Sequence, residues 1–209
     1  MGRIPLVPRP CQDAQMSRFV IPRLSLPAAL LISLGMIAVT AGILAWMGRI
    51  PICQCGYVEL WHGGRNDSGT SQHLTDWYTY SHILHGLIFY FLLWAILRGR
   101  LSFAARLVIA VGIECAWEVF ENTPFIINRY RAQTISRDYF GDTIVNSVAD
   151  IVAMMVGFFL AWRLPPWLTV LLLIGTEVAL LYLIRDNLFL NILMLIYPLD
   201  WIRQWQAGG

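Results

Sequence analysis

Residues 79–97 read TYSHILHGLIFYFLLWAIL, a run without Asp, Glu, Lys or Arg that carries two histidines near its start. A helix needs roughly 20 predominantly apolar residues to cross the hydrocarbon core of a bilayer. This run therefore predicts a membrane-spanning helix with polar side chains at one end. Four further runs predict spans of the same kind: Leu26–Met47, Phe103–Glu121, Asp142–Trp162 and Trp167–Ile184.

The composition supports this fold class. Among 209 residues, 57% are hydrophobic and 13% are charged, and this charged fraction is about half that of an ordinary soluble protein. Such a chain has too little interior for its apolar side chains, so lipid must serve as part of its solvent. We predict an all-α, polytopic membrane helix bundle of about five spans. The net charge of +2 excludes a basic nucleic-acid-binding protein.

The chain ends with a shorter apolar stretch, Leu188–Leu199, which is followed by Asp200 and Arg203. It is too short to cross a bilayer and predicts an interfacial or re-entrant helix. We therefore expect a cytoplasmic N-terminal tail (1–25), a transmembrane bundle (26–184) with an outer loop (48–78), and a C-terminal interfacial segment (185–209).

The arginines predict the orientation, because basic residues favour cytoplasmic connections. The short connection from Arg98 to Arg106 holds three Arg and no acidic residue. It predicts a cytoplasmic N-terminus, with outward-facing connections after the first and third spans. In this orientation eight arginines lie inside and seven outside.

Four predicted spans carry polar side chains, and helical spacing places those of each span on one face. These residues are His82 and His85, then Glu114, Glu118 and Glu121, then Asp142, Asn146 and Asp150, and finally Glu177. All would lie within roughly 12 Å of the outer boundary. One such residue is usually structural, but Glu114, Glu118 and Asp150 would together cost on the order of 9 kcal/mol if ionised. Protonation, pairing with Arg or a bound cation must remove this cost, and the layer predicts a functional polar pocket.

The residue types in this layer suit proton transfer or metal binding. The predicted catalytic residues are Glu118, Asp142, Asp150, His82 and His85, because carboxylates and imidazoles act as general acids and bases. The predicted ligands of a divalent metal are His82, His85, Glu114 and Glu118, which resemble the carboxylate–histidine sites of helical bundles. No spacing as specific as H-E-x-x-H occurs, and neutralisation by arginine is the competing interpretation.

Three arginines, Arg129, Arg131 and Arg137, lie between the third and fourth predicted spans. They either anchor this connection to lipid headgroups or bind an anion, because guanidinium groups suit phosphate and carboxylate. On the second interpretation the substrate-binding residues are Arg129, Arg131, Asn122 and Asn146.

The outer loop contains two cysteines and two histidines: Cys53, Cys55, His62 and His73. A disulfide between the cysteines is one expectation in an oxidising compartment, and a zinc site shared with the histidines is the other. Asp76 lies shortly before His82 and is a candidate to orient an imidazole.

Three stretches carry a family resemblance: SQHLTDWYTYSHILHGLIFY (71–90), WEVFENTPFIINRYRAQTIS (117–136) and DYFGDTIVNSVADIVAMMVGF (138–158). Together they resemble uncharacterised protein family 0314, also called domain of unknown function 2585, from Arg49 to Leu164. The resemblance implies a multi-pass protein of the bacterial inner membrane, and it brings no known activity, cofactor, partner or catalytic residue. The D-x-x-x-N spacing of Asp142 and Asn146 is a looser likeness to VanZ-like membrane proteins.

Three classes of function remain. The first is an enzyme of the outer leaflet that acts on an anionic lipid or a lipid-linked headgroup. The second is a non-enzymatic lipid-binding or accessory protein, which no residue excludes. The third is an ion-coupled carrier, which needs a polar path through both leaflets, whereas the cytoplasmic halves of the predicted spans are apolar. The lipid bilayer is the expected partner in each case.

Overall fold

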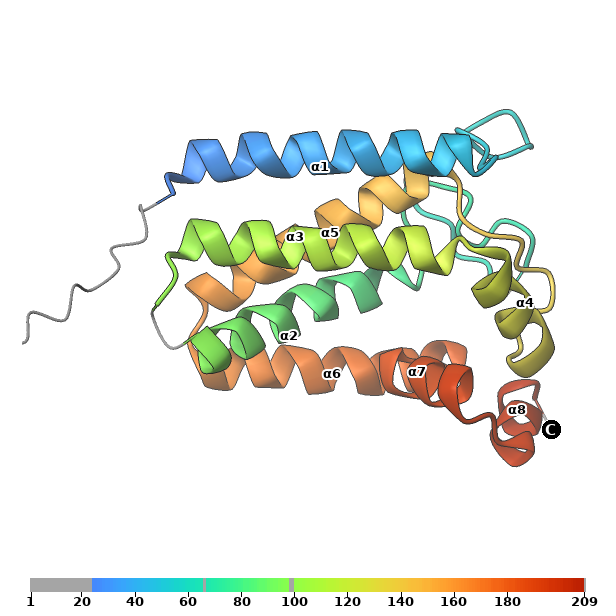
Figure 1. Cartoon of the computed structure of the whole chain (residues 1–209). Helices are drawn as coiled ribbons and strands as arrows, with labels where there is room; N and C mark the ends of the chain where they lie inside the picture. Colours follow the sequence, from blue (N-terminus) through green and yellow to red (C-terminus); the bar gives the residue numbers. More distant parts are fainter. Residues whose placement is uncertain (1–23, 66, 98–99, 209) are drawn as a thin grey trace, which may run out of the picture.

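The computed structural model describes residues 24–65, 67–97 and 100–208, and every regular element in this part of the chain is a helix. The helices are α1 (Leu26–Trp46), α2 (Thr79–Leu97), α3 (Phe103–Glu121), α4 (Pro124–Gln133), α5 (Ile144–Arg163), α6 (Pro166–Ile184), α7 (Leu188–Ile196) and α8 (Asp200–Gln206). Five of them are long and run lengthwise through the molecule (Figure 1). The predicted all-α helix bundle is confirmed. Arg98 and residues 1–23 of the predicted tail lie outside the described residues.

Capping residues decide where several long helices begin. The side chains of Ser25, Ser102 and Thr143 accept hydrogen bonds from backbone N–H groups in the first turns of α1, α3 and α5. These bonds satisfy donors that every helix start leaves without a partner. Because Thr143 caps α5, Asp142 precedes the helix instead of opening it, which corrects the predicted start of that span.

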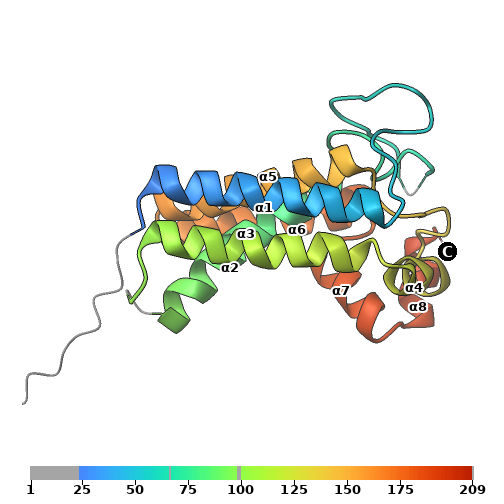
Figure 2. The same cartoon turned by 45° about the horizontal axis from the view of Figure 1, so that its top comes forward.

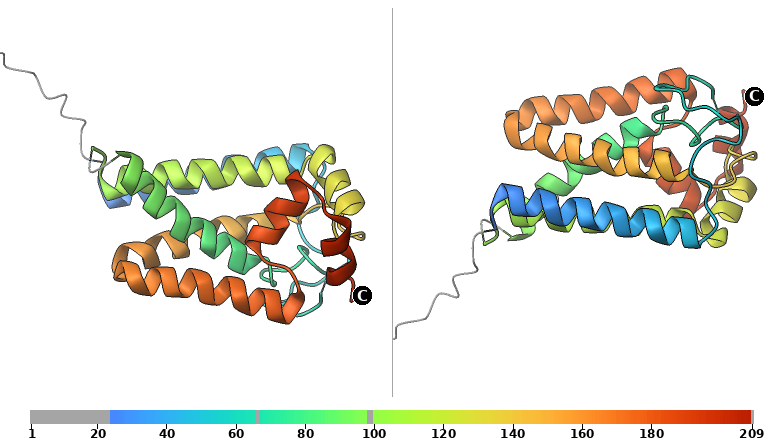
Figure 3. Two further views of the ribbon diagram at one scale, coloured as in Figure 1. Left: turned by 90° about the horizontal axis from the view of Figure 1, so that it is seen from below. Right: turned by 90° about the horizontal axis from the view of Figure 1, so that it is seen from above.

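Four helices, α1, α2, α5 and α6, are long and apolar enough to cross a membrane. The predicted span Phe103–Glu121 forms α3 and has the same length as α2, but its four charged residues lower its hydropathy. It lies alongside α1 (Figures 1 and 3). Three of the four charged residues, Arg106, Glu114 and Glu118, are buried among the neighbouring helices.

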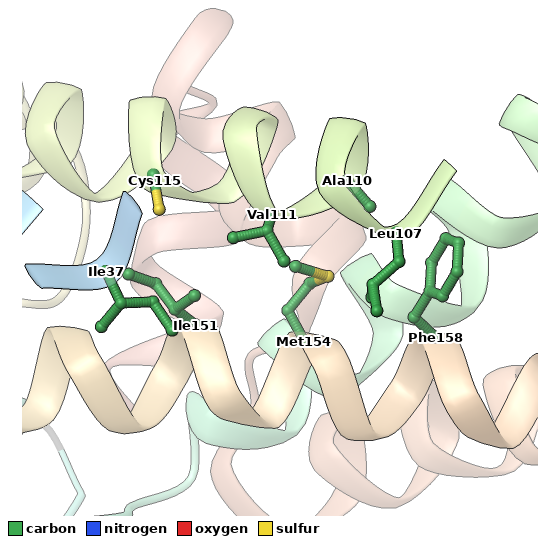
Figure 4. Close-up of a cluster of buried hydrophobic side chains, with 8 residues drawn as sticks. All are labelled: Ile37, Leu107, Ala110, Val111, Cys115, Ile151, Met154 and Phe158. Atoms are coloured by element: carbon green, nitrogen blue, oxygen red, sulfur yellow. The ribbon is translucent and has the colours of Figure 1, made fainter. Parts of the chain in front are cut away.

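An apolar core joins α1, α3 and α5. Leu107 and Val111 of α3 face Ile151 and Met154 of α5, and Ile37 of α1 closes one side (Figure 4). In a bilayer such a core stabilises the bundle through van der Waals packing, because lipid tails are as apolar as the side chains. The polar side chains of α3 and α5 lie next to this core, near the end of α3 and the start of α5.

Two glycines let α2 and α5 approach closely. A Cβ atom on Gly86 would lie 2.0 Å from the carbonyl oxygen of Met154, and one on Gly157 would lie 2.0 Å from that of Ile83. Helix backbones come this close only where small residues meet. The contact fixes the histidines of α2, which lie within about one turn before Gly86, relative to α5.

The remaining elements gather at one end of the bundle, which we call the loop end (Figures 1 and 2). There α1, α3 and α6 finish, α2 and α5 begin, and the outer loop meets α4, α7 and α8. Sequence reasoning predicts no helix between the third and fourth spans, yet Thr123 caps α4 and Pro124 begins it, a typical helix start. The segment Leu188–Leu199 forms α7, whose 9 residues are too few to cross a bilayer.

Candidate functional site

Ionisable side chains of three helices meet near the loop end. Nδ1 of His82 on α2 lies 2.6 Å from Oε1 of Glu114 and 3.5 Å from Oε1 of Glu118, both on α3. One turn later, Nδ1 of His85 lies 3.1 Å from each carboxylate oxygen of Glu114. Nε2 of His82 lies 3.8 Å from Oδ2 of Asp150 on α5. The structure therefore brings these five residues together, and we call them the acid–imidazole cluster.

Part of this cluster lacks hydrogen-bond partners. Glu114 and Glu118 are both completely buried, at 0% exposure. Glu114 is hydrogen-bonded to both imidazoles, whereas neither oxygen of Glu118 has a hydrogen-bond partner among the described residues, and nor does Oδ1 of Asp150. A buried, unpaired carboxylate is costly. Glu118 is thus the member that most requires a proton or a cation.

A cavity of about 710 Å³ lies beside the cluster. Its polar lining includes His82, His85, Glu114, Glu121, Asp142 and Asp150. Its apolar lining includes Phe89, Ile113, Trp117, Phe120, Phe125 and Ile192. Four of these, Ile113, Phe120, Phe125 and Ile192, are between 43% and 67% exposed. The cavity therefore has a charged interior and an apolar rim that reaches the outer surface of α3 and α7.

Asn122, at the end of α3, holds Asp142 in the cavity wall. Nδ2 of Asn122 donates to Oδ2 of Asp142 at 2.9 Å, and the backbone N–H of Asp142 donates to Oδ1 of Asn122 at 2.8 Å. The Tyr139 hydroxyl donates to the other carboxylate oxygen at 3.0 Å. Burial raises the pKa of Asp142, and the bonds from Asn122 and Tyr139 oppose this rise. Asn122 thus orients a lining residue and does not line the cavity itself.

Asn146, the other amide predicted to bind substrate, ties the outer loop to α5. Its Nδ2 donates to the carbonyl oxygen of His73 at 3.0 Å. The preceding loop residue, Gln72, donates to the carbonyl oxygen of Gly141 at 2.9 Å. Both amide side chains are buried and neither lines the cavity.

The two arginines predicted to bind an anion lie in different surroundings. Arg129 lines the cavity, and its Nε and Nη2 donate to the carbonyl oxygens of Leu195 and Ile196 at 2.6 and 2.9 Å. These carbonyls belong to the last turn of α7, where a helix leaves acceptors without a partner. Arg131 is exposed, and its Nε donates to the carbonyl oxygen of Arg137. The structure does not bring Arg131 to the cavity.

Glu177 lies apart from the cluster and caps α7. Its two carboxylate oxygens accept the backbone N–H groups of Leu188 and Phe189 at 3.0 and 3.1 Å. A negative charge at a helix N-terminus also complements the helix dipole. α7 is therefore held by charged side chains at both ends, by Glu177 at the first turn and Arg129 at the last.

Sequence reasoning missed several polar residues of the loop end. Tyr78, Tyr130 and Tyr139 line the cavity, although tyrosines near a membrane surface are commonly interfacial residues. Asp186 is buried and accepts hydrogen bonds from the Tyr78 hydroxyl and from Nε2 of Gln206, each at 3.0 Å. Burial raises the pKa of Asp186 to about 6. Its place directly after an apolar span was the one indication of a structural role.

The cysteines and histidines of the outer loop lie close together, because the ligand atoms of Cys53, Cys55 and His73 are within 4.8 Å of one another. Cys53 and Cys55 are joined as a disulfide. His62 is held between two carboxylates, with Nδ1 3.0 Å from Oε2 of Glu59 and Nε2 2.8 Å from Oδ1 of Asp67. Glu59, His62 and His73 nevertheless have ligand atoms within 4.8 Å of one another, so this group is a second place to consider for a metal.

The sequence makes Asp76 a candidate to orient an imidazole, but its carboxylate is hydrogen-bonded to backbone groups instead. Its carboxylate accepts the backbone N–H groups of Ser71 and Tyr78 at 2.6 and 2.8 Å. Burial raises its pKa, and these two bonds oppose the rise. Asp76 therefore shapes the turn that leads into α2.

Comparison with known sequences identifies the relatives of this chain. The model of the family described as "Protein of unknown function (DUF2585)" matches residues 44–208. A UPF0314 protein of Paracoccus denitrificans is 56% identical over 165 residues, which is 79% of this chain and 85% of that protein. Others from Rhizobium meliloti and Rhizobium etli are 54% and 59% identical, over 86% and 78% of this chain and 90% and 83% of those proteins. No solved structure matches the chain. The chain belongs to the uncharacterised protein family 0314, and the region that the family model matches contains the whole acid–imidazole cluster.

Proposed function

We propose that this protein is a multi-pass protein of the bacterial inner membrane, with its N-terminus in the cytoplasm and its loop end outside. The start of α1 lies at the end of the bundle opposite the loop end (Figure 1). The connection between α2 and α3, which carries Arg100, lies at that same end, as does the first turn of α3, which carries Arg106. Basic residues in short connections favour the cytoplasmic side, so the cavity would open toward the outer leaflet.

We further propose that the cavity binds the headgroup of an anionic lipid or lipid-linked molecule, and that the protein is an enzyme that acts on this headgroup. One observation carries it: four members of the acid–imidazole cluster, His82, His85, Glu114 and Asp150, line a cavity whose rim is apolar and exposed. A lipid has the matching shape, with a polar headgroup for the cluster and acyl chains for the outer surfaces of α3 and α7. Pockets that bind small molecules combine apolar walls with a few convergent polar groups in this way.

The chemistry that these residues support is proton transfer at the headgroup. Asp142 and Asp150 both line the cavity, where a carboxylate can remove a proton from water or a hydroxyl group and a carboxylic acid can return one to a leaving group. Asp142 is held ready by Asn122 and Tyr139. Hydrolysis of a headgroup, or its transfer, is the reaction class that these groups support best.

Occupation of the cavity is tested by filling its rim. Ile113→Trp places a large side chain in the lining, whereas Ile109→Trp, one turn earlier on the outer surface of α3, is a matched control outside the lining. The proteins are extracted in native lipid discs, and their lipids are quantified by mass spectrometry. We expect one lipid class to be enriched with the unmodified protein and with Ile109→Trp, and lost with Ile113→Trp. If the lipid composition of all three samples equals that of the bulk membrane, specific lipid binding is refuted.

A second measurement separates the enzyme from the non-enzymatic lipid-binding alternative. The lipids of a deletion strain are compared after complementation with the unmodified protein or with Asp150→Asn. An enzyme requires the substrate lipid to accumulate in the deletion strain and with Asp150→Asn, and to disappear with the unmodified protein. An unchanged lipid profile, together with retained lipid binding, would favour the alternative.

A further inference from the structure

Glu118 is not explained by proton transfer at the headgroup. It does not line the cavity, it is completely buried, and both its oxygens lack hydrogen-bond partners among the described residues. Its Oε1 nevertheless points toward the cluster, 3.5 Å from Nδ1 of His82. We propose that the acid–imidazole cluster binds a divalent transition-metal ion through His82, His85, Glu114 and Glu118, and that this ion gives the cavity its affinity for a phosphate-bearing headgroup. The second half of this inference rests on the proposed function.

The spacing of the four side chains suits a metal ion. In a tetrahedral zinc site with metal–ligand bonds of about 2.0–2.2 Å, neighbouring ligand atoms lie about 3.3 Å apart. The nitrogen–oxygen distances in the cluster are 2.6, 3.1 and 3.5 Å. The ligand atoms of His82, His85 and Glu114 all lie within 4.8 Å of one another. Shifts of less than about 1 Å would bring these three pairs to the spacing of a metal site. Glu118 forms a second such group with His82 and Glu121, so its side chain would also have to turn toward His85 and Glu114 to complete the coordination.

The charge of the cluster favours a bound cation over pairing with an arginine. Glu114, Glu118 and Asp150 are buried carboxylates, and in the part of the chain that the structure describes their ion pairs are with histidines, not with arginine. Arg129, the arginine of the cavity wall, donates to α7 instead. The competing interpretation, neutralisation by arginine, therefore has no contact to support it. Buried charges are normally paired or bound to metal.

The surroundings of His82 favour metal binding through Nδ1. Asp150 lies 3.8 Å from Nε2 on the opposite side of the ring, the place where ligating histidines typically have a carboxylate that orients the imidazole and fixes its tautomer. Two imidazoles and two carboxylates form a nitrogen–oxygen ligand set that suits Zn²⁺, Fe²⁺ or Mn²⁺.

The same ion would determine the class of substrate. Acidic side chains outnumber the basic ones in the lining of the cavity and would repel a phosphate group in the absence of a cation. His85 and Glu114 lie on the lining, so an ion between them is accessible from the cavity. Four protein ligands fill a tetrahedral site, so a phosphoryl oxygen or an attacking water would bind this ion as a fifth ligand.

The test is the metal content of the full-length protein purified in detergent, stripped with chelator and reloaded separately with Zn²⁺, Mn²⁺ or Fe²⁺. We expect one ion per chain for the unmodified protein and binding at least about 10-fold weaker for Glu118→Gln. Glu59→Gln is the matched control, because Glu59 belongs to the histidine group of the outer loop, and this variant should keep its metal. Absence of stoichiometric metal in the unmodified protein, or loss of metal from Glu59→Gln, would overturn the inference.

X-ray absorption of the metal-loaded unmodified protein gives a readout that does not depend on the folding of a variant. We expect nitrogen and oxygen ligands with the signature of two imidazoles, and sulfur ligands would instead place the ion at the loop cysteines and refute the site.

Lipid analysis of the stripped and reloaded samples separates the two proposals. Phosphate-bearing lipid bound equally with and without metal would remove the ion's role in substrate choice and leave the proposed function intact. Stoichiometric metal without any enriched lipid would refute the proposed function and leave the metal site intact.

Discussion

The glutamates of the predicted spans have very different hydrogen-bond partners. Glu114 is hydrogen-bonded to two imidazoles, Glu118 lacks partners in the described structure, and Glu177 accepts two backbone N–H groups. Helical spacing predicts correctly that Glu114 and Glu118 share a face. It cannot predict that Glu177 caps α7, because that contact depends on how the chain folds back after α6.

Asp186 yields a prediction of pH dependence. Its pKa in the folded protein is about 6, whereas an aspartate in an unfolded chain titrates near 3.9. The folded state therefore keeps a proton that the unfolded chain has lost, so this contribution to stability is fully present below about pH 4 and is lost as the pH rises through about 6. The difference is on the order of 3 kcal/mol.

The measurement is the unfolding temperature in detergent between pH 4 and 7.5. The unmodified protein should lose more stability over this range than Asp186→Asn, which has no carboxyl group to titrate. Asp200→Asn, at a side chain that is 81% exposed, should follow the unmodified protein. Parallel curves for the unmodified protein and Asp186→Asn would show that burial does not raise this pKa.

At the scale of elements, apolar length and capping residues predict the long helices and many of their ends. Ser25 caps α1 and Pro27 lies in its first turn, a pattern typical of a helix start. Sequence reasoning fails at α4, whose arginines and tyrosine lower its hydropathy and conceal the helix start at Thr123. It also gives no account of Gly86 and Gly157, because the close approach of α2 and α5 is a property of two helices together.

Gly157→Ala tests this approach. The added methyl group would meet the carbonyl oxygen of Ile83, and overpacking of this kind typically costs about 1–3 kcal/mol. We expect a lower unfolding temperature and a cluster whose histidines are displaced from Asp150. Gly175→Ala is the matched control, because a Cβ atom there meets nothing within 4 Å. Equal stability of the two variants would contradict the close packing of α2 against α5.

The whole molecule combines an apolar bundle with a polar end. The sequence predicts the membrane class, the all-α fold and the common height of the polar residues, because each depends on composition or on helical periodicity. It predicts a polar pocket but not the walls of the cavity, because these include α4 and α7, whose positions follow from contacts between distant segments. The hydrogen bonds of Arg129 and Asn146 were beyond prediction for the same reason.

The orientation of the molecule is a prediction at this scale. Alkaline phosphatase, which is active in the periplasm, is fused after Gly64 in the outer loop or after Arg100 in the connection to α3. We expect activity at Gly64 and none at Arg100, because the loop end should face outward. The opposite pattern would place the cavity on the cytoplasmic side, and a lipid would then enter it from the inner leaflet.

The central claim is that α2, α3 and α5 turn their polar side chains toward one shared site. An experimental density map of the protein in lipid discs tests this most directly. We predict that the imidazole of His82 lies between Glu114 and Asp150, with Glu118 directed at the same ring. A map in which Glu118 or Asp150 faces the acyl chains, away from His82, would contradict the account.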